Sequence, residues 1–392
     1  MKQSSLPLPD FSAIAHSRQL SVCLKNLIDE CEGSISFDKY MNLVLYQPEL
    51  GYYNSATQKF GPKGDFVTAP EISSLFSKCI AAQCSQILGD FEESAILEIG
   101  AGNGTMARDL LLDLEKRHLL PGKYYILEIS PYLKLKQKKL LREALPQFID
   151  NIEWLSTLSN LKFKGLVLAN EVIDALPVKR FKKESSSFKE MKVGYSKDNF
   201  YWLDVVADPF LTEHLKDLES KLPAPFPSNY YSEINVQLKE WLNIIQSTID
   251  EGVILFIDYG YSVLDYYHPS RFDGNLLCHY RHHVHNDPFF YPGLQDITTS
   301  VNFSAVAEYA GDIGLNVSGY TNQVYFLFGC GLDDLVVKMN LQDISSQTKL
   351  SQELRKLTMP DEMGERFKVI GLTKKYNKKL TCFSKMNQIN RL

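Results

Sequence analysis

The stretch Ala95-Ile96-Leu97-Glu98-Ile99-Gly100-Ala101-Gly102-Asn103-Gly104-Thr105 decides how this chain is expected to fold. Ile96, Leu97 and Ile99 form a short apolar run that predicts a buried parallel strand, and apolar residues recur at helical spacing after Thr105. The glycines therefore form a strand-to-helix turn. Glycine permits positive φ and leaves no Cβ between backbone and ligand, while the new helix presents unbonded N–H groups. We expect a nucleotide-like ligand at this turn.

The spacing of the glycines indicates which ligand the turn holds. A dinucleotide-binding G-x-G-x-x-G turn would need glycine at position 105, which is threonine here. The observed G-x-G-x-G turn resembles that of class I S-adenosylmethionine-dependent methyltransferases, although a purely structural turn is an alternative. Glu128 ends a second predicted strand over residues 124–128, where its carboxylate can accept hydrogen bonds from both hydroxyls of a ribose. Together the two features favour a nucleoside cofactor.

Composition is that of an ordinary globular protein and does not select an activity. The 392 residues suit about two to three domain-sized units, and a net charge of −5 gives no electrostatic case for a nucleic-acid partner. The seven cysteines contain no C-x-x-C pair, so neither a disulfide framework nor a zinc site is indicated. No signal-peptide h-region follows Met1, and no apolar run approaches the ~20 residues that span a bilayer. We therefore expect a cytoplasmic protein without a membrane span.

Strands and helices alternate between residues 95 and 175, which predicts a parallel sheet covered on both faces. Polar groups follow two of the apolar strands: Asn170, Glu171 and Asp174 come after residues 165–169, and Asp258 follows residues 253–257. Because ligands of open α/β sheets bind at the carboxyl edge, these side chains are candidates for a site.

The flanking segments predict additional elements around this sheet. Thr68-Ala69-Pro70-Glu71 is a capping box for a helix running to residue 87, and the loop at residues 61–66 is expected to close over the cofactor. Short strands over residues 179–206 predict an antiparallel insertion. We expect five regions: an N-terminal helical and lid region (1–92), a first part of the core (93–178), an inserted substrate-side subdomain (179–248), a second part of the core (249–335) and a C-terminal helical tail (336–392).

Several motifs occur together and in a fixed order, and as a set they resemble the MidA family. They are the segment from Gly64 to Ser73, the turn around Gly100, Leu127 to Pro131 with Gln137, Asn170-Glu171 with Asp174 to Pro177, and Asp258-Tyr259-Gly260. The resemblance implies a Rossmann-like class I methyltransferase fold with S-adenosylmethionine as cofactor. For the mitochondrial branch of the family it implies symmetric dimethylation of a protein arginine.

Arginine is a difficult acceptor because its guanidinium, with a pKa above 12, is a poor nucleophile at neutral pH. Carboxylates can bind its N–H groups bidentately and assist loss of a proton. We predict Glu171, Asp174 and Asp258 as catalytic residues, although an acid after a strand often caps the next turn. The predicted cofactor contacts are Gly64, Asp65, Glu98, Gly100, Gly102, Asn103, Gly104, Glu128, Ile129 and Asn170.

Other functions stay open at this stage. The run Cys278, His279, His282, His283, His285 and Asp287 contains zinc-ligand types, but it lacks tetrahedral spacing, and methyl transfer from a sulfonium needs no metal, so we expect none. Ser300 and Asn302 stand where the family pattern has His and Asp, so no proton transfer is assigned to them. A protein substrate is favoured over methylation of a small molecule or another side chain, and over a non-catalytic assembly factor. The sequence leaves a homodimer open.

Overall fold

The computed structural model describes residues 6–55, 65 and 67–392, so Gly64 and most of the predicted lid loop lie outside the described residues. The chain divides into two compact units. The first unit consists of Met1–Phe66, Asp174–Leu238 and Val263–Ser300, and the second of Val67–Ile173, Lys239–Ser262 and Val301–Leu392. These bounds differ from the predicted regions, because the N-terminal region is divided at residue 66 and residues 263–300 leave the second part of the core. No helix among the described residues is long and apolar enough to cross a membrane.

The second unit is built on a mixed sheet in the order β15-β16-β10-β5-β2-β3-β4, with β14 beside β10. The strands from β10 to β4 are parallel, as the alternation of strands and helices predicts. Their bounds are β2 Ala95–Ile99, β3 Lys123–Leu127, β4 Ile152–Leu155, β5 Phe163–Asn170, β10 Ile249–Tyr261, β14 Val301–Asn302, β15 Asn316–Asn322 and β16 Phe367–Lys374.

Amphipathic helices cover this sheet. In α5 the buried residues Met106, Leu110 and Leu114 recur at helical spacing and belong to one core cluster with Ile96 of β2. Helix α6 buries only Leu133, Gln137 and Leu141, while Lys136 and Lys139 are exposed. The helices of this unit are α3 Ala69–Ile72, α4 Ser74–Leu88, α5 Thr105–Lys116, α6 Pro131–Ala144, α8 Leu238–Thr248, α10 Phe303–Asp312, α11 Gln323–Gly329, α12 Leu332–Met339, α13 Ile344–Thr358 and α14 Met363–Arg366.

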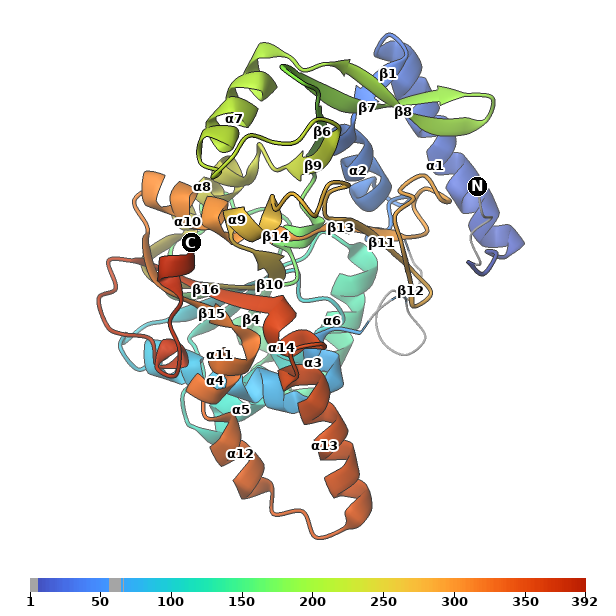
Figure 1. Cartoon of the computed structure of the whole chain (residues 1–392). Helices are drawn as coiled ribbons and strands as arrows, with labels where there is room; N and C mark the ends of the chain where they lie inside the picture. Colours follow the sequence, from blue (N-terminus) through green and yellow to red (C-terminus); the bar gives the residue numbers. More distant parts are fainter. Residues whose placement is uncertain (1–5, 56–64, 66) are drawn as a thin grey trace. The chain divides into compact units, whose positions relative to one another are not determined.

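Two predicted elements differ from the structure. The C-terminal segment is not a purely helical tail, because β16 lies between β10 and β15 and pairs antiparallel with both (Figure 1). The helix predicted from the capping box to residue 87 is divided into α3 and α4 at Ser73, whose φ of −154° and ψ of 137° are extended. The capping box itself is present, and the N–H of Thr68 donates to Glu71 Oε2 at 3.3 Å.

The first unit contains the predicted antiparallel insertion. Its larger sheet has the order β1-β7-β6-β9, with β8 beside β7, and its smaller sheet the order β12-β11-β13. The strands are β1 Ser34–Ser36, β6 Lys179–Lys183, β7 Phe188–Ser196, β8 Asn199–Val206, β9 Tyr230–Ile234, β11 Leu276–Tyr280, β12 His283–His285 and β13 Asp296–Thr299. The helices are α1 Phe11–Glu30, α2 Phe37–Tyr46, α7 Pro209–Ser220 and α9 Val263–Tyr266.

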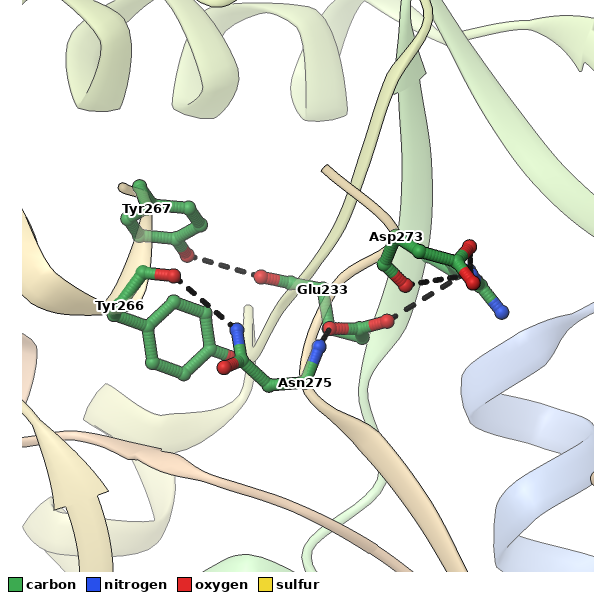
Figure 2. Close-up of polar contacts among 6 residues, drawn as sticks. Glu233, Tyr266, Tyr267, Asp273 and Asn275 are labelled. Carbon is green, nitrogen blue, oxygen red and sulfur yellow. Dashed lines mark hydrogen bonds and ion pairs between the residues drawn. The ribbon is translucent and has the colours of Figure 1, made fainter. Parts of the chain in front are cut away.

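A buried ion pair links β6 and β9 inside the first unit. Arg180 Nε lies 3.6 Å from Glu233 Oε1, and Arg180 Nη2 donates to Asp273 Oδ1 at 2.9 Å. Figure 2 shows the other contacts of Glu233: its Oε2 accepts the N–H of Asn275 at 2.7 Å, and its carbonyl accepts the Tyr267 hydroxyl. Burial raises the pKa of Glu233, while the positive charge of Arg180 opposes this shift. The positive charge of Arg180 and the N–H of Asn275 both favour the ionised form of Glu233.

We predict that Arg180→Leu lowers the free energy of unfolding by about 3–5 kcal/mol, since it leaves a buried carboxylate without its cation. Lys182→Leu on the same strand is the matched control. Lys182 pairs with Asp204, whose side chain is 39% exposed, and such exposed pairs contribute little to the free energy of unfolding. Urea unfolding followed by circular dichroism compares the two variants, and equal losses would contradict the special role of Arg180.

Candidate functional site

The glycine turn between β2 and α5 has the backbone that its sequence predicts. Gly100, Gly102 and Gly104 have φ values of 69°, 55° and 88°, which L side chains rarely adopt. A Cβ on Gly100 would lie 2.9 Å from Cγ2 of Val172. Asn103 Oδ1 accepts the N–H of Thr105 at 3.1 Å and its hydroxyl at 2.7 Å, so the side chain holds the start of α5. The turn therefore exposes backbone and cannot tolerate larger residues at these glycines.

Gln137 joins this turn to the acid at the end of β3. Its Nε2 donates to the carbonyl of Gly102 at 2.7 Å and to Glu128 Oε2 at 2.8 Å, and its Oε1 accepts the Trp154 Nε1–H at 3.0 Å. The N–H of Ser130 donates to Glu128 Oε1 at 2.8 Å. These bonds orient Glu128 beside the turn. Gln137 was not among the predicted site residues, although it belongs to the family motif and replaces an apolar residue in the buried stripe of α6.

Two acids near the turn have structural partners. Glu98 is 1% exposed on β2, and its Oε2 accepts the Tyr124 hydroxyl at 2.7 Å. Burial raises the pKa of Glu98 to about 7, an effect that the Tyr124 bond opposes and the nearby Glu128 charge reinforces. Glu71 caps α3 and also accepts a hydrogen bond from the Asn103 side chain. Glu71 thus connects α3 to the glycine turn. Its position in the capping box predicted only the cap of the helix and not this second contact.

The polar groups after β5 and within β10 lie close together. Asp258 is 1% exposed, and its Oδ2 accepts the N–H groups of Val172 at 3.2 Å and Ile173 at 3.0 Å. Glu171 has a φ of 55°, and its N–H donates to the carbonyl of Ile257 at 2.9 Å. Asn170 Nδ2 donates to Glu171 Oε1 at 3.1 Å. Asp258 therefore anchors the backbone that positions Glu171.

Two predicted site residues, Asp65 and Asp174, belong to the first unit. The carboxylate of Asp65 accepts the N–H of Arg281 at 2.6 Å and the Tyr52 hydroxyl at 2.7 Å, so it holds the turn after β11. Asp174 is 5% exposed in the short helix Ile173–Ala175. Burial lowers the pKa values of His279 and His285 in the histidine-rich run. Among the described residues, no group of three or more His, Cys, Asp and Glu side chains is arranged to hold a metal ion.

The sheet order and the glycine turn are those of a class I S-adenosylmethionine-dependent methyltransferase. Residues 79–321 match a family model described as "Putative S-adenosyl-L-methionine-dependent methyltransferase". The chain belongs to this MidA-like family of enzymes, and the predicted family, fold class and cofactor are confirmed.

Solved structures and curated relatives agree with this assignment. A crystal structure of a protein from Burkholderia thailandensis bound to S-adenosyl-homocysteine is 34% identical, with a TM-score of 0.92 over 99% of this chain and 100% of that chain. Protein arginine methyltransferase NDUFAF7, mitochondrial, from Danio rerio is 28% identical over 86% of this chain and 82% of the relative. Its Homo sapiens counterpart is 26% identical over 87% of this chain and 80% of the relative.

The prediction of a cytoplasmic protein is wrong by this comparison. The relatives from Danio rerio, Mus musculus and Homo sapiens are all named as mitochondrial proteins. The prediction rested on scattered cysteines and on apolar patterning, and neither observation bears on mitochondrial targeting, because mitochondrial transit peptides are amphipathic and rich in arginine.

The residues around the turn fit S-adenosylmethionine. Gly100 and Gly102 would contact the cofactor through backbone groups that no side chain covers. Glu128 would accept hydrogen bonds from the ribose hydroxyls. Ile129, which is 49% exposed, would offer an apolar surface beside them. When bound, this cofactor supplies a methyl group activated by a sulfonium. The roles of the individual side chains, including Glu98, Asn103, Gly104 and Asn170, stay predictions, as do those of Glu171, Asp174 and Asp258.

We predict that Gln137→Leu weakens S-adenosylmethionine binding about tenfold, or roughly 1.4 kcal/mol, because it removes the hydrogen bonds that align Gly102 with Glu128. Calorimetric titration measures the affinity, and circular dichroism verifies that the variant is folded. Lys139→Leu, an exposed position on the same helix, controls for the added apolar side chain. Unchanged affinity in folded Gln137→Leu would contradict the alignment role.

We also predict that Glu98 makes stability depend on pH. Its folded pKa of about 7 exceeds its usual value of 4.5, so the native state holds the extra proton between these pH values. The free energy of unfolding therefore falls as pH rises through this window, by about 3 kcal/mol.

The matching experiment is urea unfolding between pH 5 and 8. Glu98→Gln removes this ionisation and should lessen the pH dependence by the part that Glu98 contributes, whereas Glu153→Gln, an exposed position on β4, should leave it as in the unmodified chain. The same slope in all three proteins would show that Glu98 does not titrate in this range.

Proposed function

We propose that this methyltransferase modifies the guanidinium of arginine in a protein substrate. The curated relatives from zebrafish and human carry the name protein arginine methyltransferase. The observation that carries the proposal is Glu171, an acid held in left-handed backbone at the carboxyl end of β5. A non-glycine residue with positive φ costs of order 1–3 kcal/mol, and such strain clusters at functional sites.

The anchored backbone explains how Glu171 keeps this conformation. Asp258 accepts the two N–H groups that follow Glu171, and Ile257 accepts the N–H of Glu171 itself. Asp258 is thus a positioning residue in this proposal, and Glu171 is the group that would accept N–H bonds from the acceptor guanidinium.

Glu171 would do two things during transfer. A carboxylate that binds two N–H groups of a guanidinium concentrates positive charge away from the attacking nitrogen. As that nitrogen gains the methyl group it must lose a proton, and a carboxylate within hydrogen-bond reach can receive it. The protein contributes mainly orientation and exclusion of water, which lower barriers by ~7–11 kcal/mol when geometry is good.

We predict that the chain transfers labelled methyl groups from S-adenosylmethionine to arginine in proteins extracted from the source organism. Acid hydrolysis followed by amino-acid chromatography identifies the labelled residue. Glu171→Gln should lower kcat by 100-fold or more while the affinity for the cofactor stays the same. Glu153→Gln is the control glutamate and should retain full activity.

Other outcomes of the labelling experiment would favour one of the alternative functions. Label on lysine or in the small-molecule fraction would indicate a methyltransferase with another acceptor. Cofactor binding without any transfer would favour a non-catalytic assembly factor. A homodimer stays a prediction.

A further inference from the structure

Helix α13 of the second unit packs on the core and carries an acid on its packed face. Leu350, Leu354 and Leu357 recur at helical spacing and belong to, or pack against, the core cluster of this unit. Glu353 lies beside them, because residues three and four apart on a helix are neighbours. Gln323 Nε2 donates to the carbonyl of Leu357 at 2.9 Å, which holds the end of α13. The place of Glu353 is therefore fixed by the packing of its helix.

Glu353 contacts the joint between α3 and α4. Helix α3 lies beside α13 (Figure 1), and the Ser73 hydroxyl at its end donates to Glu353 Oε2 at 2.6 Å. Ser73 Oγ also accepts the N–H of Leu75 at 3.3 Å, which caps α4. The other partner of Glu353 among the described residues is Lys349, 3.9 Å away and 79% exposed. One side chain of α13 thus holds the residue at which α3 ends and α4 begins.

The same short helix contacts the glycine turn. Glu71 of α3 accepts the N–H of Thr68 through Oε2 and the side-chain amide of Asn103 through Oε1. Asn103 Oδ1 accepts the N–H and the hydroxyl of Thr105 at the start of α5. Helix α3 therefore connects α13 to the turn between β2 and α5.

The length of α3 makes its orientation depend on these contacts. It spans only Ala69–Ile72, and helices shorter than about 12 residues are marginal in water without tertiary support. Its buried residues are Ala69 and Pro70. The bond of Ser73 to α13 and the bond of Glu71 to the turn therefore act on a segment that has little rigidity of its own.

We propose that Glu353 is a positioning residue of the cofactor site, which acts through Ser73 and Glu71 on Asn103. The hydroxyl bond fixes the joint after α3, and the fixed joint keeps Glu71 where it accepts the Asn103 amide. Asn103 is then held through both ends of its side chain, and the turn keeps the backbone that exposes its N–H and C=O groups to the cofactor. The inference concerns the cofactor alone, so it does not depend on the acceptor proposed above.

Loss of this connection has a defined consequence for binding. When α3 is released from α13, the glycine turn adopts its binding conformation for a smaller fraction of the time. The apparent dissociation constant of S-adenosylmethionine rises by the inverse of that fraction. The C-terminal segment, far from the turn in the sequence, thereby contributes to cofactor affinity without touching the cofactor.

The test is calorimetric titration of the full chain with S-adenosylmethionine, with circular dichroism to verify folding. Glu353→Ala should raise Kd about fivefold or more, a change in the range of measured couplings between sites. Glu353→Gln keeps an oxygen that accepts the Ser73 hydroxyl, so its Kd should equal that of the unmodified chain. Lys349→Ala is the matched control, since it removes the exposed ion pair of the same acid and leaves the Ser73 bond.

A double-mutant cycle separates this connection from a general loss of stability. Asn103→Ala removes the contact of the turn with Glu71, so Glu353→Ala added to it should raise Kd no further. Two independent losses would instead multiply in the double variant.

A second pair of variants tests the same bond if Glu353→Ala does not fold. Ser73→Ala removes the hydroxyl and should raise Kd about fivefold or more, whereas Ser73→Thr retains the hydroxyl and should keep the affinity. An unchanged Kd in folded Glu353→Ala or Ser73→Ala overturns the inference. An equal rise in Glu353→Gln or Lys349→Ala also overturns it, as do losses that multiply in the cycle.

Discussion

The left-handed backbone between β2 and α5 is the constraint on which the cofactor site depends. Gly100, Gly102 and Gly104 all have positive φ, and this conformation brings the carbonyl of Gly102 to Gln137. Gln137 in turn aligns Glu128, so one amide side chain couples the turn to the acid at the end of the neighbouring strand. A side chain at these glycines would be strained whatever space surrounds it, because the φ values alone disfavour it.

Three buried acids in this protein have different hydrogen-bond donors. Asp258 accepts the N–H groups of Val172 and Ile173, so it anchors the backbone at residues 171–173. Glu98 and Asp296 each accept a tyrosine hydroxyl, and burial raises the pKa of both. In these two acids burial favours the protonated form unless a positive charge lies nearby.

Local patterns predicted the elements whose signals lie within a few residues. The capping box at Thr68, the helix beginning at Thr105 and the strand-terminal acid Glu128 all appear in the structure. Strand β16 was missed because its identity depends on pairing with β10, about 110 residues earlier in the chain, and with β15. The extended Ser73 was missed for a similar reason, since apolar spacing continues across it and its hydroxyl bonds to Glu353 of α13.

The sequence by itself determined the class of fold, the glycine turn and the nature of the cofactor, because glycine spacing, apolar runs and strand-terminal acids act through adjacent residues. Only the tertiary structure showed which groups each acid contacts. Asp258 proved to hold backbone amides, Glu71 to reach Asn103, and Asp296 to lie in a cluster of acids and phenols. These roles depend on burial and on partners distant in the chain. Burial and distant partners determine the free energy of burying an ionised group, and no local sequence pattern indicates either of them.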